Sequence, residues 1–178
     1  MNKIIVAMFL LLVAEVVCGS QQHSSQWIKY SSPEGRYSVL LPGEPKLSSQ
    51  EASTADGAKF TQYMASSPDA NTVCLIGYFD HVGNRVFNFD KSRDGFIGAV
   101  KGTLLTESVI SLGGYPGREM KVTAKSADGA EYVLRVRTYD VGSRVYVVQF
   151  IFLSSEDTPA VAENARKYFD SFALTKER

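Results

Sequence analysis

The sequence predicts an α+β fold, a mostly antiparallel sheet covered by a helix on each face as an α/β/α sandwich. Most of the chain places apolar residues at a period of two, interrupted by turns that contain glycine or proline. Two runs, 73–79 and 145–153, are apolar on both faces, which is typical of strands covered from both sides. Two segments, 89–104 and 157–172, have apolar residues at helical spacing and are expected to supply the covers.

Residues 1–20 are expected to be a signal peptide. Lys3 precedes a short apolar run over residues 4–14, and small and polar residues follow that run. The run is too short to span a bilayer as a helix, and no later segment is long enough, so the mature chain is expected to have no transmembrane span. The sequence therefore predicts an extracytoplasmic protein, either periplasmic or secreted.

Cys18 has two interpretations. In the first, the signal is cleaved between Cys18 and Gln21, and the mature chain has no anchor. In the second, Cys18 is the lipid-modified first residue of a bacterial lipoprotein, and the lipid anchors the protein to the membrane. Glu15 and Val17 depart from the residues that lipoprotein signals usually have before the cysteine. Both interpretations stay open at this point.

Residues 21–26 are expected to form a flexible segment, and residues 27–175 a single domain, which is long enough to bury a core without disulfides. Cys74 is the only other cysteine and is expected to be buried in a strand. The formal net charge of zero argues against an electrostatic footprint for nucleic acid or for an anionic membrane surface.

The strands are predicted as pairs joined by turns. Three hairpins are expected, at 27–30 with 37–41, at 46–55 with 58–65, and at 117–125 with 130–141. The last two have Asp-Gly at their turns, a pair that tolerates positive φ. Segment 46–55 is largely polar and is expected at a sheet edge, where polar residues prevent association between sheets.

Each helical segment has residues that can start a helix. Asn88 or Asp90 can cap the first segment, whose apolar face is expected to run from Phe89 to Leu104. Asp157 or Thr158 can cap the second, with Pro159 at its first position. The apolar stripe of the second helix consists of Val161, Ala165, Tyr168 and Phe172. Leu134, Val148 and Phe169 are expected in the core between the sheet and the helices.

Three segments carry a family resemblance: WIKYSSPEGRYSVLLPGEP at 27–45, GYPGRE at 114–119 and RKYFDSF at 166–172. Together they resemble uncharacterised secreted bacterial proteins of PsbP-like type, a group similar in fold to the PsbP subunit of photosystem II and to the Mog proteins. The resemblance covers most of the mature chain in element order. It implies a PsbP-like sandwich that binds or assists other proteins, and it implies no catalytic residue and no cofactor.

The chemistry of the sequence indicates no enzyme. His81 is the only histidine in the predicted domain, and no nucleophile motif accompanies it. Asp80, His81, Asp90 and Asp94 could ligate a cation, but their spacing matches no known metal loop, and solvated strand ends explain them equally well. The glycine-rich segment 113–117 leads into a strand rather than a helix, so it is expected to form a turn and not a phosphate site.

Four aromatic residues at strand spacing are expected in the core and not on a base-stacking surface, namely Tyr63, Tyr132, Tyr146 and Phe150. Nucleic acid is therefore not an expected partner.

One charged surface is a candidate partner-binding site. Alternation places Arg135 and Arg137 on the face opposite Leu134 and Val136, so both arginines are expected to point away from the core. On the preceding strand, Glu119, Lys121 and Lys125 also share a face. If the two sets lie on the same side, they form a mixed, net basic patch in which Lys121, Arg135 and Arg137 are the candidate contacts. The alternative is a solvated face with cross-strand salt bridges.

The function predicted from the sequence is a secreted or envelope-associated, non-enzymatic domain that binds or assists an envelope protein. The alternative is an extracytoplasmic module that binds a small ligand or an ion. A deep pocket lined by polar groups would favour the alternative, whereas a shallow apolar patch ringed by charge would favour protein binding.

Overall fold

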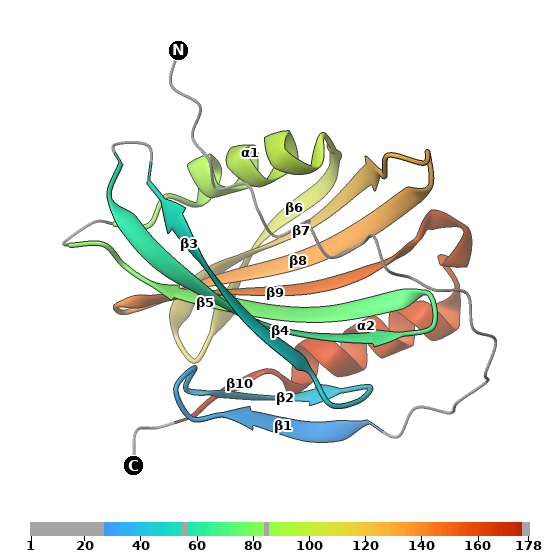
Figure 1. Ribbon diagram of the computed structural model, residues 1–178. Coiled ribbons are helices and arrows are strands. Elements are labelled where there is room, and N and C mark those ends of the chain that lie inside the picture. The colour runs from blue at the N-terminus through green and yellow to red at the C-terminus, as the bar shows by residue number, and fades with distance from the viewer. Residues whose placement is uncertain (1–26, 55–56, 84–85, 176–178) are drawn as a thin grey trace.

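The computed structural model describes residues 27–54, 57–83 and 86–175. These residues form a seven-stranded sheet, a three-stranded sheet and two α-helices, and every strand pairing is antiparallel (Figure 1). The predicted α+β class with a mostly antiparallel sheet is thereby confirmed. The predicted signal peptide 1–20, Cys18 within it and the segment 21–26 lie outside the described residues. Among the described helices, none has the length and apolar character needed to cross a bilayer.

The large sheet has the strand order β3-β4-β5-β9-β8-β7-β6. In chain order its strands are β3 (Lys46–Ser53), β4 (Lys59–Asp69), β5 (Thr72–Asp80), β6 (Thr103–Leu112), β7 (Tyr115–Lys125), β8 (Glu131–Val141) and β9 (Arg144–Leu153). The two doubly apolar runs predicted from the sequence are the central pair, β5 and β9. The polar strand β3 lies at one edge, as its composition predicted.

The small sheet has the order β1-β2-β10 and consists of β1 (Ile28–Ser32), β2 (Tyr37–Leu41) and β10 (Ala173–Leu174). The predicted opening hairpin is therefore present, but its strands do not pair with the main sheet. The two residues of β10 follow the second helix and pair with β2, which joins the two ends of the domain. The small sheet lies beside that helix (Figure 1), and β2 packs against it.

Helix α1 (Phe89–Val100) begins where the Asn88 side chain accepts a hydrogen bond from the backbone N–H of Lys91 at 2.9 Å. It ends at Lys101, which has a left-handed conformation with φ of 49°. The expectation that the helical face continues to Leu104 was wrong, because Leu104 lies in β6. Gly102 permits this change of direction, since a Cβ there would lie 2.6 Å from the carbonyl oxygen of Thr123.

A short 3-10 turn (Ser154–Glu156) leads from β9 to α2 (Pro159–Ser171). Thr158 caps α2 by accepting a hydrogen bond from the N–H of Val161 at 3.3 Å, with Pro159 in the first turn as expected. Phe172, expected on the helical stripe, is the C-cap residue that follows α2, and it is buried in the core.

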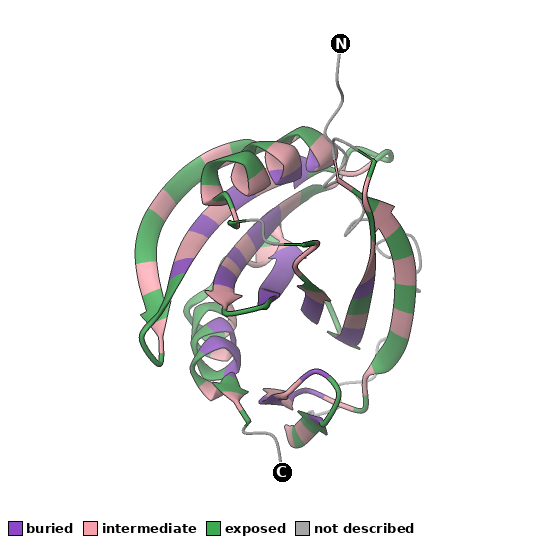
Figure 2. Ribbon diagram, turned by 90° about the vertical axis from the view of Figure 1, so that its left-hand side faces the viewer, coloured by how far each residue is buried: buried purple, intermediate pink, exposed green. Residues whose placement is uncertain are grey.

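Two core clusters draw on alternating residues of the central strands. From β9, Tyr146, Val148, Phe150 and Phe152 enter one cluster, whereas Val145, Val147 and Ile151 enter the other. The first cluster also contains Ala165, Tyr168 and Phe169 of α2, and the second contains Phe96 and Val100 of α1. Figure 2 shows buried residues along the central strands and exposed residues along the outer ones.

The residues predicted for the core are buried, namely Leu134, Val148 and Phe169. Cys74 is also buried, as predicted, and this burial raises the pKa of its thiol.

Candidate functional site

The structure brings the predicted contact residues together on two neighbouring strands. In the register of β7 and β8, Lys121 lies opposite Arg135 and Glu119 lies opposite Arg137. The Glu119 carboxylate accepts hydrogen bonds from Arg135 Nη2 at 3.0 Å and from Arg137 Nε at 2.7 Å. The two charged sets therefore lie on the same side of the sheet.

This surface has the cross-strand salt bridges of the alternative, from Arg135 and Arg137 to Glu119, but the two arginines are not fully solvated. Lys121 Nζ donates to Asp157 Oδ2 at 3.1 Å, and Arg137 Nη1 lies 3.5 Å from Asp170 Oδ1. With Glu119, these two acids balance the three basic residues. The sequence alternation could not show this balance, because Asp157 and Asp170 lie just before and within α2, far along the chain.

The aromatic ring of Phe169 lies beneath both arginines. The guanidinium carbons of Arg135 and Arg137 are 5.5 Å and 4.7 Å from the ring centre. Their side chains are only 27% and 20% exposed. Burial acts to raise the pKa of Glu119, but the hydrogen bonds from Arg135 and Arg137 outweigh it and lower this pKa. The arginines thus help to dock α2 on the sheet.

A second surface is a groove that the sequence did not indicate, here called the tyrosine groove. It has a volume of about 490 Å³ and lies between the first hairpin, β1 and β2, and the edge hairpin, β3 and β4. Its lining consists of Tyr30, Ser32, Glu34, Tyr37, Leu47, Ser48, Tyr63, Met64, Ala65, Tyr78, Asp80 and Arg144.

The basic residue in the lining of this groove is Arg144, whose side chain is only 10% exposed. Its guanidinium donates to Asp80 twice, from Nε at 2.7 Å and from Nη2 at 3.0 Å, and to the carbonyl oxygen of Glu34 at 2.6 Å. It also lies 4.5 Å from the centre of the Tyr78 ring. The hydrogen bonds from Arg144 lower the pKa of Asp80. Three sides of the guanidinium are therefore occupied within the chain.

Aromatic rings and an exposed apolar rim make up most of the groove. Tyr63 stacks on Tyr78 with 5.0 Å between ring centres, and Tyr78 meets Tyr37 edge-on at 6.3 Å. At the rim, Leu47 is 63% exposed and Tyr63 is 43% exposed. Tyr63 was expected in the core, and this was wrong because it lies near the outer edge of the sheet, where no helix covers it.

The sequence contained one signal for this site. Arg144 begins β9, whose other residues are apolar except for Gln149, and Asp80 ends the other doubly apolar strand. Because neighbouring antiparallel strands run in opposite directions, the end of β5 meets the start of β9, where Asp80 and Arg144 are paired. The aromatic lining had no comparable signal, since it depends on how the small sheet lies against the edge hairpin.

The residues considered as cation ligands have other partners. Asp80 is bonded to Arg144, and His81 Nε2 lies 2.7 Å from Asp140 Oδ1. Asp90 and Asp94 both pair with Arg93. Over the described ranges, no group of three or more histidine, cysteine, aspartate or glutamate side chains is arranged to hold a metal ion.

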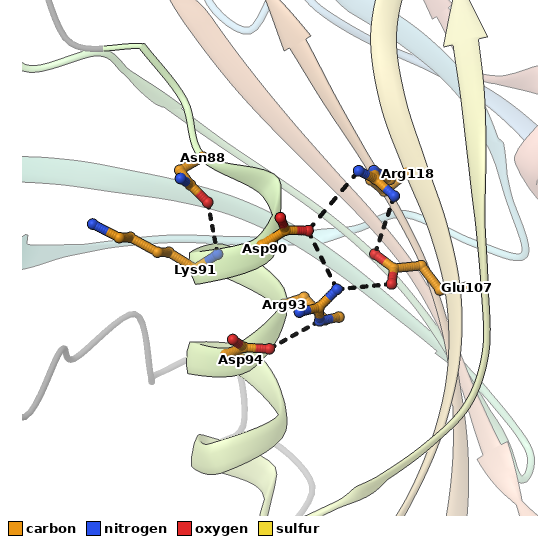
Figure 3. Close-up of polar contacts among 7 residues, drawn as sticks. All are labelled: Asn88, Asp90, Lys91, Arg93, Asp94, Glu107 and Arg118. Atoms are coloured by element: carbon orange, nitrogen blue, oxygen red, sulfur yellow. Dashed lines mark hydrogen bonds and ion pairs between the residues drawn. The ribbon is translucent and has the colours of Figure 1, made fainter.

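Arg93 belongs to a charged cluster that fastens α1 to the sheet (Figure 3). It donates to Asp94 at 2.9 Å and to Glu107 of β6 at 2.9 Å. Arg118 of β7 lies 3.7 Å from Glu107 and 3.9 Å from Asp90. This cluster connects a helix with two strands and has a structural role.

Comparison with known proteins gives similarity in fold but no family assignment. No protein-family model matches the sequence, and no curated protein matches it. Among solved structures, a Bacteroides thetaiotaomicron protein is 17% identical, with a TM-score of 0.49, and the match covers 84% of this chain. The chain spans only 48% of the length of that protein.

Two further structures span most of the domain. LpqN of Mycobacterium tuberculosis, described as involved in cell envelope biogenesis, is 14% identical with a TM-score of 0.43, over 76% of this chain and 86% of LpqN. The cyanobacterial PsbP of Synechocystis is 10% identical with a TM-score of 0.54, over 89% of this chain and 97% of PsbP. The match to PsbP supports the resemblance found in the sequence, and the chain has a PsbP-like fold.

Proposed function

We propose that this chain is a non-enzymatic, extracytoplasmic domain that binds another protein through the tyrosine groove. The observation that carries the proposal is the exposed rim of Leu47 and Tyr63 above a floor of stacked tyrosines. Exposed apolar side chains beside an aromatic groove and ringed by charge are typical of protein-binding surfaces. The partner is expected to insert an aliphatic or aromatic side chain between Leu47 and Tyr63.

The polar groups of the groove support an apolar anchor over a polar ligand. The Arg144 guanidinium is bonded to Asp80 and to the carbonyl of Glu34, so a ligand carboxylate or phosphate would have to replace these bonds. The hydroxyl of Tyr146 donates to the carbonyl oxygen of Gly35 at 2.7 Å. Arg144 and Tyr146 therefore position the first hairpin against the main sheet and keep the groove open to a partner.

Lys121, Arg135 and Arg137 remain part of the proposal as a secondary contact. Lys121 is the most exposed of the three, and its partner Asp157 is half exposed. A partner carboxylate could exchange with Asp157 at small cost, because exposed ion pairs contribute little to stability. This surface is expected to affect the association rate more than the lifetime of the complex.

The cellular setting is also part of the proposal. Export through the signal peptide 1–20, followed by release or by lipid attachment at Cys18, would place the groove outside the cytoplasm. We also infer that α1 and α2 cover opposite faces of the main sheet. The two core clusters, each of which contains residues of one helix, support this arrangement.

A small-ligand function is the second candidate, and one observation favours it. The groove volume of about 490 Å³ lies within the range of pockets that hold small molecules. A ligand of this class would be mainly apolar and aromatic, because a polar ligand would have to compete with Asp80 for Arg144.

The test compares variants in the capture of envelope proteins. Leu47→Ser combined with Tyr63→Ser removes the apolar rim, and Tyr115→Ser is the matched control because Tyr115 has a similar exposure of 41% on β7. We expect the double variant to lose the partner that the wild-type domain captures, while Tyr115→Ser retains it. Equal capture by all three proteins would refute the proposal. Native mass spectrometry of the purified protein detects a small molecule if the second candidate is correct.

A further inference from the structure

Strand β6 is an open edge of the main sheet. It is the last strand in the order, and among the described residues no strand pairs with its outer side (Figure 1). Edge strands present unpaired backbone N–H and C=O groups to any other strand that can approach. Exposed charges, proline or short length usually prevent such pairing. β6 has ten residues, no proline and one charged residue, Glu107.

That single charge is already neutralised. Glu107 Oε2 accepts a hydrogen bond from Arg93 at 2.9 Å, and its other oxygen lies 3.7 Å from Arg118 (Figure 3). Its side chain is 18% exposed. The opposite edge, β3, differs because it has exposed residues of both signs, Lys46 and Glu51. Apart from a bulge at its first residues, β6 therefore has weaker protection against another strand than β3.

The regular part of β6 has a defined centre. The register with β7 shifts between Leu104 and Thr106, where a bulge distorts the strand. At the other end the chain turns at Gly113, which has φ of 58°. The segment between these points, Thr106 to Leu112, pairs with β7 without interruption. Its middle residue is Val109, which is 75% exposed.

From this geometry we infer that β6 pairs with β6 of a second copy of the chain, antiparallel and with Val109 opposite Val109. This register uses the whole regular segment. It places Thr106 opposite Leu112 of the second copy, Glu107 opposite Ser111 and Ser108 opposite Ile110. Opposite residues then lie on the same face of the joined sheet, as the strand period requires. The two main sheets become one continuous sheet with a two-fold axis at Val109.

Charge and the bulge disfavour the registers that are shifted toward the start of β6. A register centred on Glu107 would place two glutamates opposite each other, which is destabilising. A register centred on Ser108 would extend into the bulge at Leu105. The net charge of the chain is zero, so two copies do not repel each other at a distance. The occupant that fits β6 is therefore a second β6.

Disulfide cross-linking tests the register directly. Opposite residues in an antiparallel pair have Cα atoms about 4.5 to 5.5 Å apart, within the reach of a disulfide. In a Cys18→Ser background, with Cys74 buried, Val109→Cys should form a covalent dimer on mild oxidation. Leu105→Cys is the control, because it is half exposed on the same strand but lies far from the proposed axis. Equal cross-linking of the two variants, or none at Val109→Cys, would overturn the register.

The oligomeric state of the unmodified protein provides the second measurement. Sedimentation equilibrium should show a dimer that dissociates on dilution. Val109→Lys places two ammonium groups at the axis and should raise the dissociation constant by about fivefold or more. Circular dichroism and thermal unfolding check that the exposed substitution leaves the fold intact. A wild-type protein that stays monomeric at millimolar concentration would contradict the inference, and this result would leave the tyrosine groove unaffected.

Discussion

Arg144 and Asp80 form a two-point salt bridge where the two central strands meet, with N···O distances of 2.7 Å and 3.0 Å. The pair lies in the tyrosine groove, and Arg144 also donates a hydrogen bond to the carbonyl oxygen of Glu34 in the turn of the first hairpin. A single side chain thereby connects the main sheet with the small sheet. Together with the hydrogen bond from Tyr146 to Gly35, this connection is expected to maintain the shape of the groove.

Asp80→Asn should destabilise the protein at neutral pH by about 1 to 2 kcal/mol, a modest value because Asp80 is more than half exposed. The pKa of Asp80 is lower in the folded state, so its contribution is present above the unfolded pKa of about 4 and is lost as the pH falls through the folded pKa. Urea unfolding from pH 7 to pH 3 should show the difference between wild type and variant shrinking. A difference independent of pH would contradict this role of Asp80.

Reversal of Arg135 and Arg137 to glutamate should cost stability as well as binding. Three carboxylates would then meet around Glu119, and the contacts of both arginines with Phe169 would be lost. We expect a loss of about 2 to 4 kcal/mol, measured by chemical denaturation. Lys121→Glu is the matched variant, since Lys121 is the more exposed contact and should cost less than about 1 kcal/mol. Equal stability of the two variants would show that α2 does not depend on the arginines.

Truncation of the core should have large effects. Leu134→Ala and Phe169→Ala should each lower the free energy of unfolding by about 2 to 5 kcal/mol, because both side chains are buried. Leu105→Ala is the control of the same residue type at an exposed position, and its loss should stay below about 1 kcal/mol. Similar losses for Leu134 and Leu105 would mean that the burial of β8 is misassigned.

Intact mass of the exported protein should show how its N-terminus is processed. We expect loss of the residues up to Cys18, Gly19 or Ser20, or a mass increase from lipid on Cys18 after removal of residues 1–17. Cys18→Ser moves the protein from the membrane to the soluble fraction only in the second case. Exported material that retains residues 1–17 would refute the signal peptide.

Local patterns were enough to predict much of the fold. The double apolar character of β5 and β9 and the caps at Asn88 and Thr158 depend on residues close together in the chain. Strand β6 was missed because its bulge at Leu105 interrupts the alternation and its apolar residues continue the pattern of α1.

The candidate sites depended more on distant contacts. Alternation correctly placed Arg135 and Leu134 on opposite faces of β8. It could not show that Phe169 of α2 covers the face that carries Arg135. Similarly, Tyr63 has the spacing of a core residue, and only its place near the sheet edge exposes it. The two-residue period of a strand shows which side chains share a face. Tertiary packing determines which element, if any, covers that face.

Site-specific photo-crosslinking at position 63 tests the central claim most directly. A photoreactive phenylalanine replaces Tyr63 in one protein and Tyr115, of similar exposure, in another, and both are exported into the native envelope. The proposal predicts a discrete cross-linked protein from position 63 that disappears when Leu47→Ser is added, and no such product from position 115. The same product from both positions, or none from position 63 while the domain is folded, would contradict protein binding in the tyrosine groove.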